Sequence, residues 1–431
     1  DSRYGGVFAR LTNILYDKYL INLTGRIDGS SRFGPGKQVG TFWSTGLGWI
    51  FSNEPVFRTI PFISFGKLRA SYGVTGNDQI GDYKYLDKWQ DIAGSYLNRP
   101  GITPYQLADS NYSWEVNRKL EAALELGLFK DRLMITTAYY RNRTGNQLIA
   151  YVLPGITGFT SYAAKNSPAL VQNSGWEIQL QTKNRLNRNW QINGNVLLTI
   201  PRNKLIAFPN LATSSYKTKL AIGQSLSVVN KYEYKGVNST TGVFEVVDQD
   251  DDGGIHFPGD SRLRGNLDPK WYGSLQANVQ YKNWQLDLLW EVRKQRAISY
   301  LYLKYLYDPP GVILENQPVA VFHRWPECSG QCALQKFSTG ANDIAKEAIS
   351  QYLDSDGYIK DISFARLRNI ELSCELPGQW LKNISMKRCR FYAQAQNLFT
   401  ITRYKVGDPE TLNLATLPPL RTVTVGLELG F

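Results

Sequence analysis

Strict alternation of apolar and polar side chains is the feature that most constrains how this chain can fold. In residues 421–431, Val423, Val425 and every second residue after them are apolar, whereas the residues between them are small or polar. Successive side chains of a β-strand point to opposite faces, so this segment predicts a strand with one wholly apolar face. The same split recurs in 19–28, 119–128, 176–181, 284–293 and 369–376. The pattern therefore predicts an all-β fold.

The length of these segments and the character of their polar faces indicate a membrane protein. About 13 or 14 such segments can be recognised, and many are near the ten-residue length of a tilted strand that crosses a bilayer. Their polar faces mix charged residues with Gly, Ala, Ser and Thr, which suits a water-filled or plugged interior. Tryptophans near strand ends fit aromatic girdles at the two membrane interfaces: Trp114, Trp176, Trp190, Trp271, Trp284 and Trp290. We expect an antiparallel transmembrane β-barrel, with one short helix near 342–352.

The connections between the predicted strands have two lengths. Short turns are expected at 16–18, 130–132, 187–189 and 282–283, and long segments at 76–112, 154–173, 201–269 and 300–360. Short turns on one side and long loops on the other are typical of outer-membrane barrels. The short turns should then face the periplasm and the long loops the outside, with residues 1–431 forming a single portion of barrel.

Composition excludes several function classes. The chain has only two histidines, His256 and His323, so imidazole catalysis and multi-histidine metal sites are poorly supported. No nucleophile–base pair stands out either, so we do not expect the protein to be an enzyme. The net charge of +12 comes from scattered Lys and Arg without a nucleic-acid-binding module, so nucleic acid is not an expected partner. The chain contains no run of 18 apolar residues, so the sequence predicts no transmembrane helix. Two alternatives stay open: a passive porin-like or structural barrel, and a soluble carbohydrate-binding β-sandwich protein.

Several short motifs occur in a fixed order along nearly the whole chain. They are RIDGSSRFG at 26–34, SYGVTGN at 71–77, NSGWE at 173–177, FARLRNI at 364–370, QNLF at 396–399 and DPE at 408–410, before a terminal Phe431. Taken together they resemble the SusC/RagA class of TonB-dependent outer-membrane transporters.

That resemblance implies a location, an activity and partners. It implies the outer membrane of a Gram-negative, Bacteroidetes-type bacterium, in contact with membrane lipid and lipopolysaccharide. It implies TonB-dependent active import of a large nutrient, oligosaccharide first and peptide second, with a SusD-like surface lipoprotein as partner. No cofactor is required. Barrels of this type have about 22 strands around a plug. We therefore expect this chain to be the C-terminal part of such a barrel, completed by an N-terminal plug and barrel part that also contacts TonB.

One acidic segment carries the spacing of a calcium loop. Asp248, Asp250 and Asp252 alternate before Gly253, so their carboxylates can converge on one hard cation while the glycine permits a sharp turn. Counted from Asp248 as the first position of a twelve-residue calcium loop, position twelve is Gly259, and the next carboxylate is that of Asp260. A structural Ca²⁺ is one interpretation of this segment, and a solvated acidic turn is the other.

Aromatic residues in the long segments are candidates for substrate binding. Flat rings can stack on sugar faces, and the candidates are Tyr83, Tyr85, Trp89, Tyr302, Tyr305 and Trp325. Packing within the loops, or contact with a partner lid, is the alternative.

Two further groups of residues carry structural expectations. Cys328 and Cys332 flank three residues in a long loop and are expected to form a disulfide, which is natural outside the cytoplasm. Arg26, Arg69, Arg366 and Arg368 are expected to line the lumen. We expect them to pair with acids on a plug or to grip a polar solute.

Overall fold

The computed structural model describes most of the chain in two compact units. The described residues are 2–91, 101–151, 156, 163–299, 311–312, 314, 316–317, 319–328, 332–339, 344–381, 386–405, 407–412 and 416–431. Unit 1 is Asp1–Leu226 and unit 2 is Ser227–Phe431. Within the described ranges, the helices are all too short or too polar to cross a membrane.

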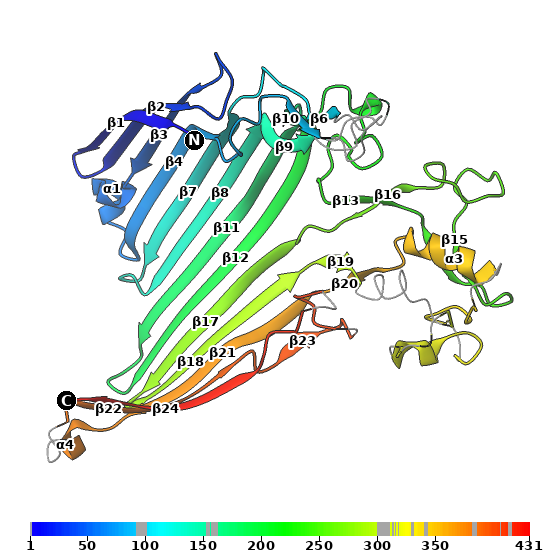
Figure 1. Cartoon of the computed structure of the whole chain (residues 1–431). Coiled ribbons are helices and arrows are strands. Elements are labelled where there is room, and N and C mark those ends of the chain that lie inside the picture. The colour runs from blue at the N-terminus through cyan, green and yellow to red at the C-terminus, as the bar shows by residue number, and fades with distance from the viewer. Residues whose placement is uncertain are drawn as a thin grey trace. The chain divides into compact units, whose positions relative to one another are not determined.

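Unit 1 is built on long antiparallel strands that lie side by side (Figure 1). In order of pairing they are β1 (Tyr4–Leu15), β2 (Tyr19–Ser30), β3 (Val39–Trp49), β4 (Ile63–Asn77), β7 (Glu115–Leu128), β8 (Leu133–Gly145), β11 (Leu170–Arg185) and β12 (Trp190–Ala207). Its connections carry β5 (Lys88–Asp91), β6 (Ile102–Gln106), β9 (Gln147–Tyr151), β10 (Ala163–Ser167), η1 (Phe51–Asn53), α1 (Pro55–Arg58) and η3 (Leu211–Thr213).

Unit 2 repeats this antiparallel arrangement. Its long strands are β17 (Trp271–Tyr281), β18 (Trp284–Lys294), β21 (Phe364–Glu375), β22 (Arg388–Gln396) and β24 (Thr422–Gly430), and the short β23 (Thr400–Thr402) pairs with β21. Its connections carry β13 (Val228–Lys231), β14 (Tyr234–Val237), β15 (Phe244–Val246), β16 (Arg262–Asn266), β19 (Arg296–Ile298), β20 (Ile359–Asp361), η4 (Val319–His323), α3 (Ile344–Leu353) and α4 (Gly378–Leu381).

Strand register places the apolar side chains of neighbouring strands on one face. Ile21, Leu47 and Ala70 stand opposite one another on β2, β3 and β4. In unit 2, Val423 and Val425 on β24 are 70% and 79% exposed. A continuous exposed apolar face is costly in water but favourable in hydrocarbon. The predicted alternation is therefore confirmed, and its apolar face is the lipid-facing side of a barrel wall.

The opposite face of unit 1 carries an aromatic cluster. It joins Phe33, Phe42, Tyr112 and Trp114. The ring centroid of Trp114 lies 5.1 Å from that of Phe33 and 5.3 Å from that of Phe42. The prediction that Trp114 belongs to a membrane girdle is wrong, because its side chain is buried in this cluster. A Cβ added at Gly76 would come within 2.0 Å of the Phe42 ring, so the glycine of the SYGVTGN motif lets that ring lie across β4.

The long connections of unit 2 fold into a small core of their own. Helix α3 lies beside β15 (Figure 1), where Tyr352 stacks on Phe244 with 4.1 Å between ring centroids. Tyr234 of β14 meets the Tyr352 ring edge-on. The predicted helix near 342–352 is confirmed as Ile344–Leu353.

Two predicted loop boundaries are wrong, because strands run further than their apolar alternation. β11 already begins at Leu170, inside the predicted loop 154–173, and β12 continues to Ala207, inside 201–269. Polar residues continue the ladder there, with Asn173 opposite Asn203. Backbone pairing does not require an apolar face, so hydropathy alone underestimates strand length.

The assignment of faces can be tested on adjacent residues of β11. Leu180 stands in a row with Ile135 and Val196 on the apolar face, whereas Gln181 points to the polar face. Leu180→Arg should destabilise the barrel by up to about 2–4 kcal/mol, because it puts a charge in hydrocarbon. Gln181→Arg is the matched control and should have little effect. Urea titration of protein refolded into bilayers measures both variants, and equal stabilities would contradict the assignment.

Candidate functional site

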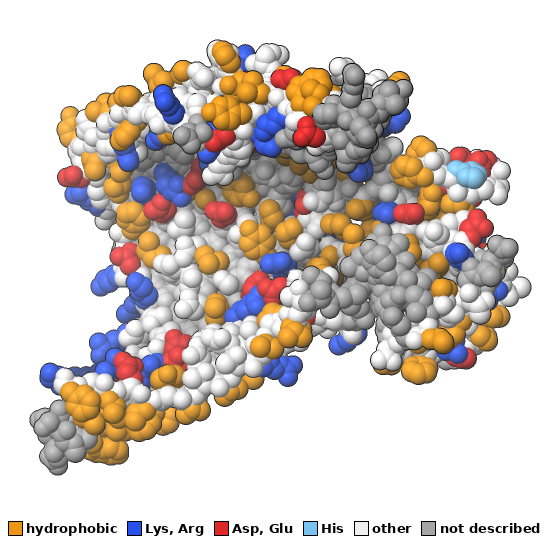
Figure 2. All heavy atoms as spheres, viewed as in Figure 1, with side chains coloured by type: hydrophobic (Ala, Val, Ile, Leu, Met, Phe, Trp, Pro, Cys, Tyr) orange, Lys and Arg blue, Asp and Glu red, His pale blue; other side chains and the backbone are white. Residues whose placement is uncertain are grey.

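Charged side chains on the polar face of unit 1 pair across neighbouring strands. Arg69 on β4 donates to Glu121 and, from Nε at 2.9 Å, to Oε1 of Glu125 on β7. Lys67 Nζ lies 3.8 Å from the same Glu125 oxygen. Figure 2 shows basic and acidic side chains lying next to one another over the strands of unit 1. In this group the two basic residues Lys67 and Arg69 balance the two acidic residues Glu121 and Glu125.

In unit 2 the polar face contains a buried arginine. The Arg366 side chain on β21 is almost fully buried, and its Nη1 lies 2.5 Å from Oε2 of Glu410. Its Nη2 donates to Asp408, and its Nε donates to Thr400 Oγ1 at 2.8 Å. A buried guanidinium is tolerated only when its donors are satisfied, and this one meets two carboxylates and a hydroxyl.

A second arginine extends this network. Nη2 of Arg368 lies 2.6 Å from Oε2 of Glu291 on β18 and 2.6 Å from Oε1 of Glu410. The Glu410 carboxylate therefore bridges Arg366 and Arg368. We call Glu291, Arg366, Arg368, Asp408 and Glu410 the arginine network; it fastens the DPE segment to the strands β18 and β21.

The RIDGSSRFG motif also forms local pairs. Nε of Arg26 donates to both carboxylate oxygens of Asp28, at 2.7 and 2.6 Å. Ser30 Oγ donates to Asp78 Oδ2 at 2.9 Å, and Arg32 Nη1 donates to the Asp78 backbone oxygen at 3.1 Å. The motif thus ties the end of β2 to the segment after β4.

The four arginines that the sequence placed in the lumen have partners within this chain. We expected acids of a plug or a polar solute instead. Sequence reasoning missed the acidic partners Glu121, Glu125, Glu291, Asp408 and Glu410. Alternation places Glu121 and Glu125 on the polar face of β7, which was an available signal. The pairing of Arg366 with the DPE segment depends on a long-range contact that no periodicity reports.

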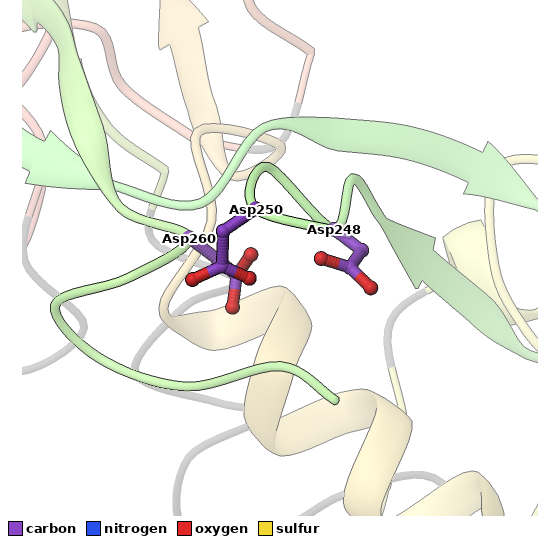
Figure 3. A group of neighbouring side chains, drawn as sticks. All are labelled: Asp248, Asp250 and Asp260. Carbon is purple, nitrogen blue, oxygen red and sulfur yellow. The ribbon is translucent and has the colours of Figure 1, made fainter. Parts of the chain in front are cut away.

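The acidic loop brings together three of its four predicted carboxylates. Side-chain oxygens of Asp248, Asp250 and Asp260 lie within 4.8 Å of one another, and Figure 3 shows these side chains grouped where the loop folds back on itself. Asp252 lies outside this group, and its Oδ1 accepts from the Gly254 backbone N–H at 2.9 Å. The structure thus favours Asp260 over Asp252 as a companion of the first two carboxylates.

Backbone donors and neighbouring charges set opposite pKa shifts in this loop. The backbone N–H groups of His256 and Gln249 donate to Asp260, at 2.7 and 2.6 Å, and lower its pKa. Burial raises the pKa of Asp250, and the nearby carboxylates of Asp252, Asp260 and Asp248 raise it further. Mutual repulsion of this kind favours a bound cation, but the backbone bonds would also hold a solvated turn. Calcium stays a prediction here.

The predicted substrate-binding aromatics of unit 1 have different surroundings. Tyr85 packs against the aromatic cluster and covers Gly34, where an added Cβ would meet the ring at 3.2 Å. Tyr83 and Trp89 are about half exposed, and the Trp89 indole N–H donates to Asp87 Oδ2 at 2.8 Å. Tyr85 thus has a packing role, whereas Tyr83 and Trp89 offer ring surface to solvent.

The remaining candidates belong to unit 2. Trp325 covers Gly242 and donates from its indole nitrogen to the Ser239 backbone oxygen at 3.2 Å, so it packs within the loop. Tyr302 and Tyr305 lie outside the described residues.

Cys328 and Cys332 are joined by a disulfide, with their Cα atoms 5.5 Å apart. The bond closes a small ring just after η4.

Comparison with known proteins gives consistent results. Residues 1–318 match the family model described as "TonB dependent receptor-like, beta-barrel". TonB-dependent receptor P3 of Formosa agariphila is 25% identical over 99% of this chain and 45% of its own length. TonB-dependent receptor SusC of Bacteroides thetaiotaomicron is 27% identical over 98% of this chain and 43% of its own length. The chain therefore spans about half the length of the curated relatives it matches.

Solved structures give the same fold. The RagAB peptide importer in its 'closed-closed' state matches 99% of this chain and 48% of its own, with a TM-score of 0.81 and 22% identity. A second RagAB structure, described as a peptide transporter, gives a TM-score of 0.80 over the whole chain. At this level of identity the match establishes the fold, which is that of an outer-membrane β-barrel. The soluble β-sandwich alternative is therefore wrong.

The arginine network should contribute strongly to stability. Arg366→Gln would leave two carboxylates without their buried partner, and loss of one member of a buried ion pair costs about 3–5 kcal/mol. Arg388 pairs with Glu375 and Glu428 at a half-exposed site, so Arg388→Gln is the matched control and should cost less than about 1 kcal/mol. Denaturant titration of the refolded protein measures both. A smaller loss for Arg366→Gln than for the control would contradict the network.

The acidic loop gives a prediction about calcium. If Ca²⁺ binds, Asp250→Asn should weaken its binding on the order of tenfold, through loss of a charged ligand. Asp251→Asn is the matched control, since Asp251 is an exposed acid of the same loop outside the group. Ca²⁺ binding should also weaken as the pH falls. The pKa of Asp250 lies above the ordinary aspartate value of about 3.9, so its carboxylate is protonated and loses its charge at a higher pH than an ordinary aspartate does.

Calorimetric titration with Ca²⁺ at several pH values measures these effects. Absence of heat in the unsubstituted protein would establish the solvated-turn interpretation.

Proposed function

This chain belongs to the TonB-dependent receptor β-barrel family, and we propose that it forms the wall of an importer of SusC/RagA type. The protein would carry a large polar nutrient across the outer membrane, with energy delivered through TonB. The observation that carries the proposal is the contrast between the faces of the strands, apolar on one side and lined by paired charges on the other.

The paired charges support a large hydrophilic substrate without a strong net charge. In unit 1, the two basic groups Lys67 and Arg69 balance the two acidic groups Glu121 and Glu125. In unit 2, the arginine network has two basic and three acidic groups. A surface with satisfied charges offers hydrogen bonds without selecting strongly for ions of one sign.

Exposed rings in the long β4–β7 connection support oligosaccharide as the substrate class. The bond from the Trp89 indole to Asp87 fixes the orientation of a ring that is 54% exposed. A flat apolar ring face beside a carboxylate suits the apolar face and the hydroxyl groups of a sugar. Peptide is the second substrate class.

A surface lipoprotein resembling SusD is the proposed extracellular partner. The long connections of unit 2 expose Val319, Phe322, Phe257 and Leu263 to solvent. Apolar side chains on an extracellular loop are costly in water and are typical of a protein interface. TonB would act through a plug in an N-terminal part of the transporter.

Substitution of Trp89 tests the substrate class in cells that produce the transporter. Trp89→Ala should reduce uptake of a labelled oligosaccharide by about tenfold at subsaturating concentration, the effect of losing a contact of roughly 1–2 kcal/mol. Trp380→Ala is the matched control, because Trp380 is also exposed but lies in the short α4 of the β21–β22 connection.

The same assay run without functional TonB tests the mechanism. Uptake should then cease. Uptake that persists would instead support a passive pore, and uptake of a labelled peptide but of no oligosaccharide would overturn the substrate class.

A further inference from the structure

The polar half of the NSGWE motif is not explained by the ion pairs described above. Asn173, Gly175 and Glu177 lie on the polar face of β11, because they alternate with the residues of its apolar face. Gln181 continues the same polar face toward the short turn. This part of β11 stands between β8 on one side and β12 on the other, so the motif meets side chains from two neighbouring strands.

Gly175 lets an aromatic ring lie over the strand. Tyr140 on β8 stands directly opposite Gly175. A Cβ added at Gly175 would come within 2.8 Å of the Tyr140 Oη atom and 2.9 Å of its Cε1 atom. A larger residue would therefore displace the ring, and the glycine permits its close approach to the backbone. Tyr140 is half-buried, so its ring forms part of the polar face of the wall.

Three asparagines stand in one row on the side of Tyr140 that leads to the long connections. They are Asn142 on β8, Asn173 on β11 and Asn203 on β12. Nδ2 of Asn203 donates to Oδ1 of Asn173 at 2.7 Å, and Oδ1 of Asn203 accepts from the Leu226 backbone N–H at 2.8 Å. Within the described part of the chain, the Asn142 amide and the Asn173 Nδ2 atom make no side-chain hydrogen bond. The row is thus anchored at Asn203 and has unused donors and acceptors at its other end.

Glu177 lies on the other side of Tyr140 and carries an unpaired charge. It stands between Ala138 on β8 and Thr199 on β12, neither of which is basic. Glu177 is exposed and, among the described residues, forms no ion pair or hydrogen bond. Glu121 on β7 differs, because its carboxylate accepts from a guanidinium group. The carboxylate of Glu177 therefore keeps its acceptor capacity for a group from outside these strands.

The chemistry of these groups matches hydroxyl groups better than ions. A hydroxyl group both donates and accepts hydrogen bonds, so it suits the Asn173 amide as well as the Glu177 carboxylate. A cation would satisfy Glu177 but would leave the amide donors unused, and an anion would be repelled by Glu177. Asn173 and Glu177 are about 13 Å apart along the strand, with Tyr140 opposite the midpoint, which suits an extended solute.

We propose that the polar face of β8 and β11 binds a neutral oligosaccharide during import. The binding residues, which we call the β8–β11 subsite, are Tyr140, Asn142, Asn173 and Glu177. A sugar ring would stack on Tyr140, and its hydroxyl groups would bond to the amides and the carboxylate around it. The charge of Glu177 would also disfavour acidic sugars. This inference rests on the proposed import function and adds a binding site on the barrel wall, on strands other than the connection that carries Trp89.

Uptake by cells that produce the complete transporter tests the subsite. The probes are labelled neutral hexasaccharides of glucose, mannose or xylose, and a labelled hexasaccharide of galacturonic acid. Glu177→Gln keeps the size of the side chain and removes its charge. It should reduce uptake of a neutral probe about tenfold at subsaturating concentration, because a charged acceptor is lost. Uptake of the acidic probe should change little, since the lost repulsion offsets the lost hydrogen bonds, so the neutral-to-acidic ratio should fall about tenfold.

A second variant tests the asparagine row. Asn173→Ala should reduce uptake of the neutral probe about fivefold, as expected for one lost hydrogen bond. Gln172→Ala is the matched control, because Gln172 is the adjacent residue and lies on the opposite face of β11, and it should leave uptake unchanged.

The outcomes separate the subsite from the import function. Undiminished neutral uptake by Glu177→Gln, in cells where the unsubstituted protein imports the probe through TonB, would overturn the subsite alone. Equal losses of neutral and acidic uptake would assign Glu177 to a structural contact and would also overturn the subsite. If the unsubstituted protein imports none of the probes, the proposed oligosaccharide function is overturned, and the sugar assignment of the subsite with it.

Discussion

Backbone hydrogen bonding in hydrocarbon is the constraint on which this structure depends. No water is available there to satisfy an unpaired N–H or C=O group, so each strand must pair along its length with its neighbours. The ladders of unit 1 meet this condition with few irregularities, and β7 and β8 pair without a register shift from Val116 to Leu128. Such regularity has a second effect, because a slip of one residue would turn every apolar side chain to the wrong face.

The two faces of the wall handle charge differently. On the polar face, basic groups meet acids of the same chain, and Glu410 joins Arg366 to Arg368 across a buried site. On the lipid face, apolar side chains such as Leu180, Ile135 and Val196 stand in rows across β11, β8 and β12. Pairing within the chain neutralises the buried charge of Arg366, as a buried guanidinium group requires.

The long connections act as structural elements as well as loops. In unit 1, Tyr85 and Trp114 pack into an aromatic cluster with Phe33 of the β2–β3 connection and Phe42 of β3. In unit 2, α3 closes a small core over β14 and β15. Much of the aromatic content of these connections is therefore committed to packing, which leaves a smaller set, including Trp89, with exposed ring surface. Aromatic composition alone therefore does not show which rings are exposed to solvent.

The sequence by itself determined the strands, their two faces and the family, because side-chain alternation and short motifs are local properties. It also located α3 and the acidic segment. Tertiary structure decided which charges meet. Of the four predicted carboxylates, Asp260 joins Asp248 and Asp250 whereas Asp252 lies outside the group. Arg366 finds its partners more than 40 residues away in the DPE segment. Periodicity reports the face of each residue, but only strand pairing determines its neighbours.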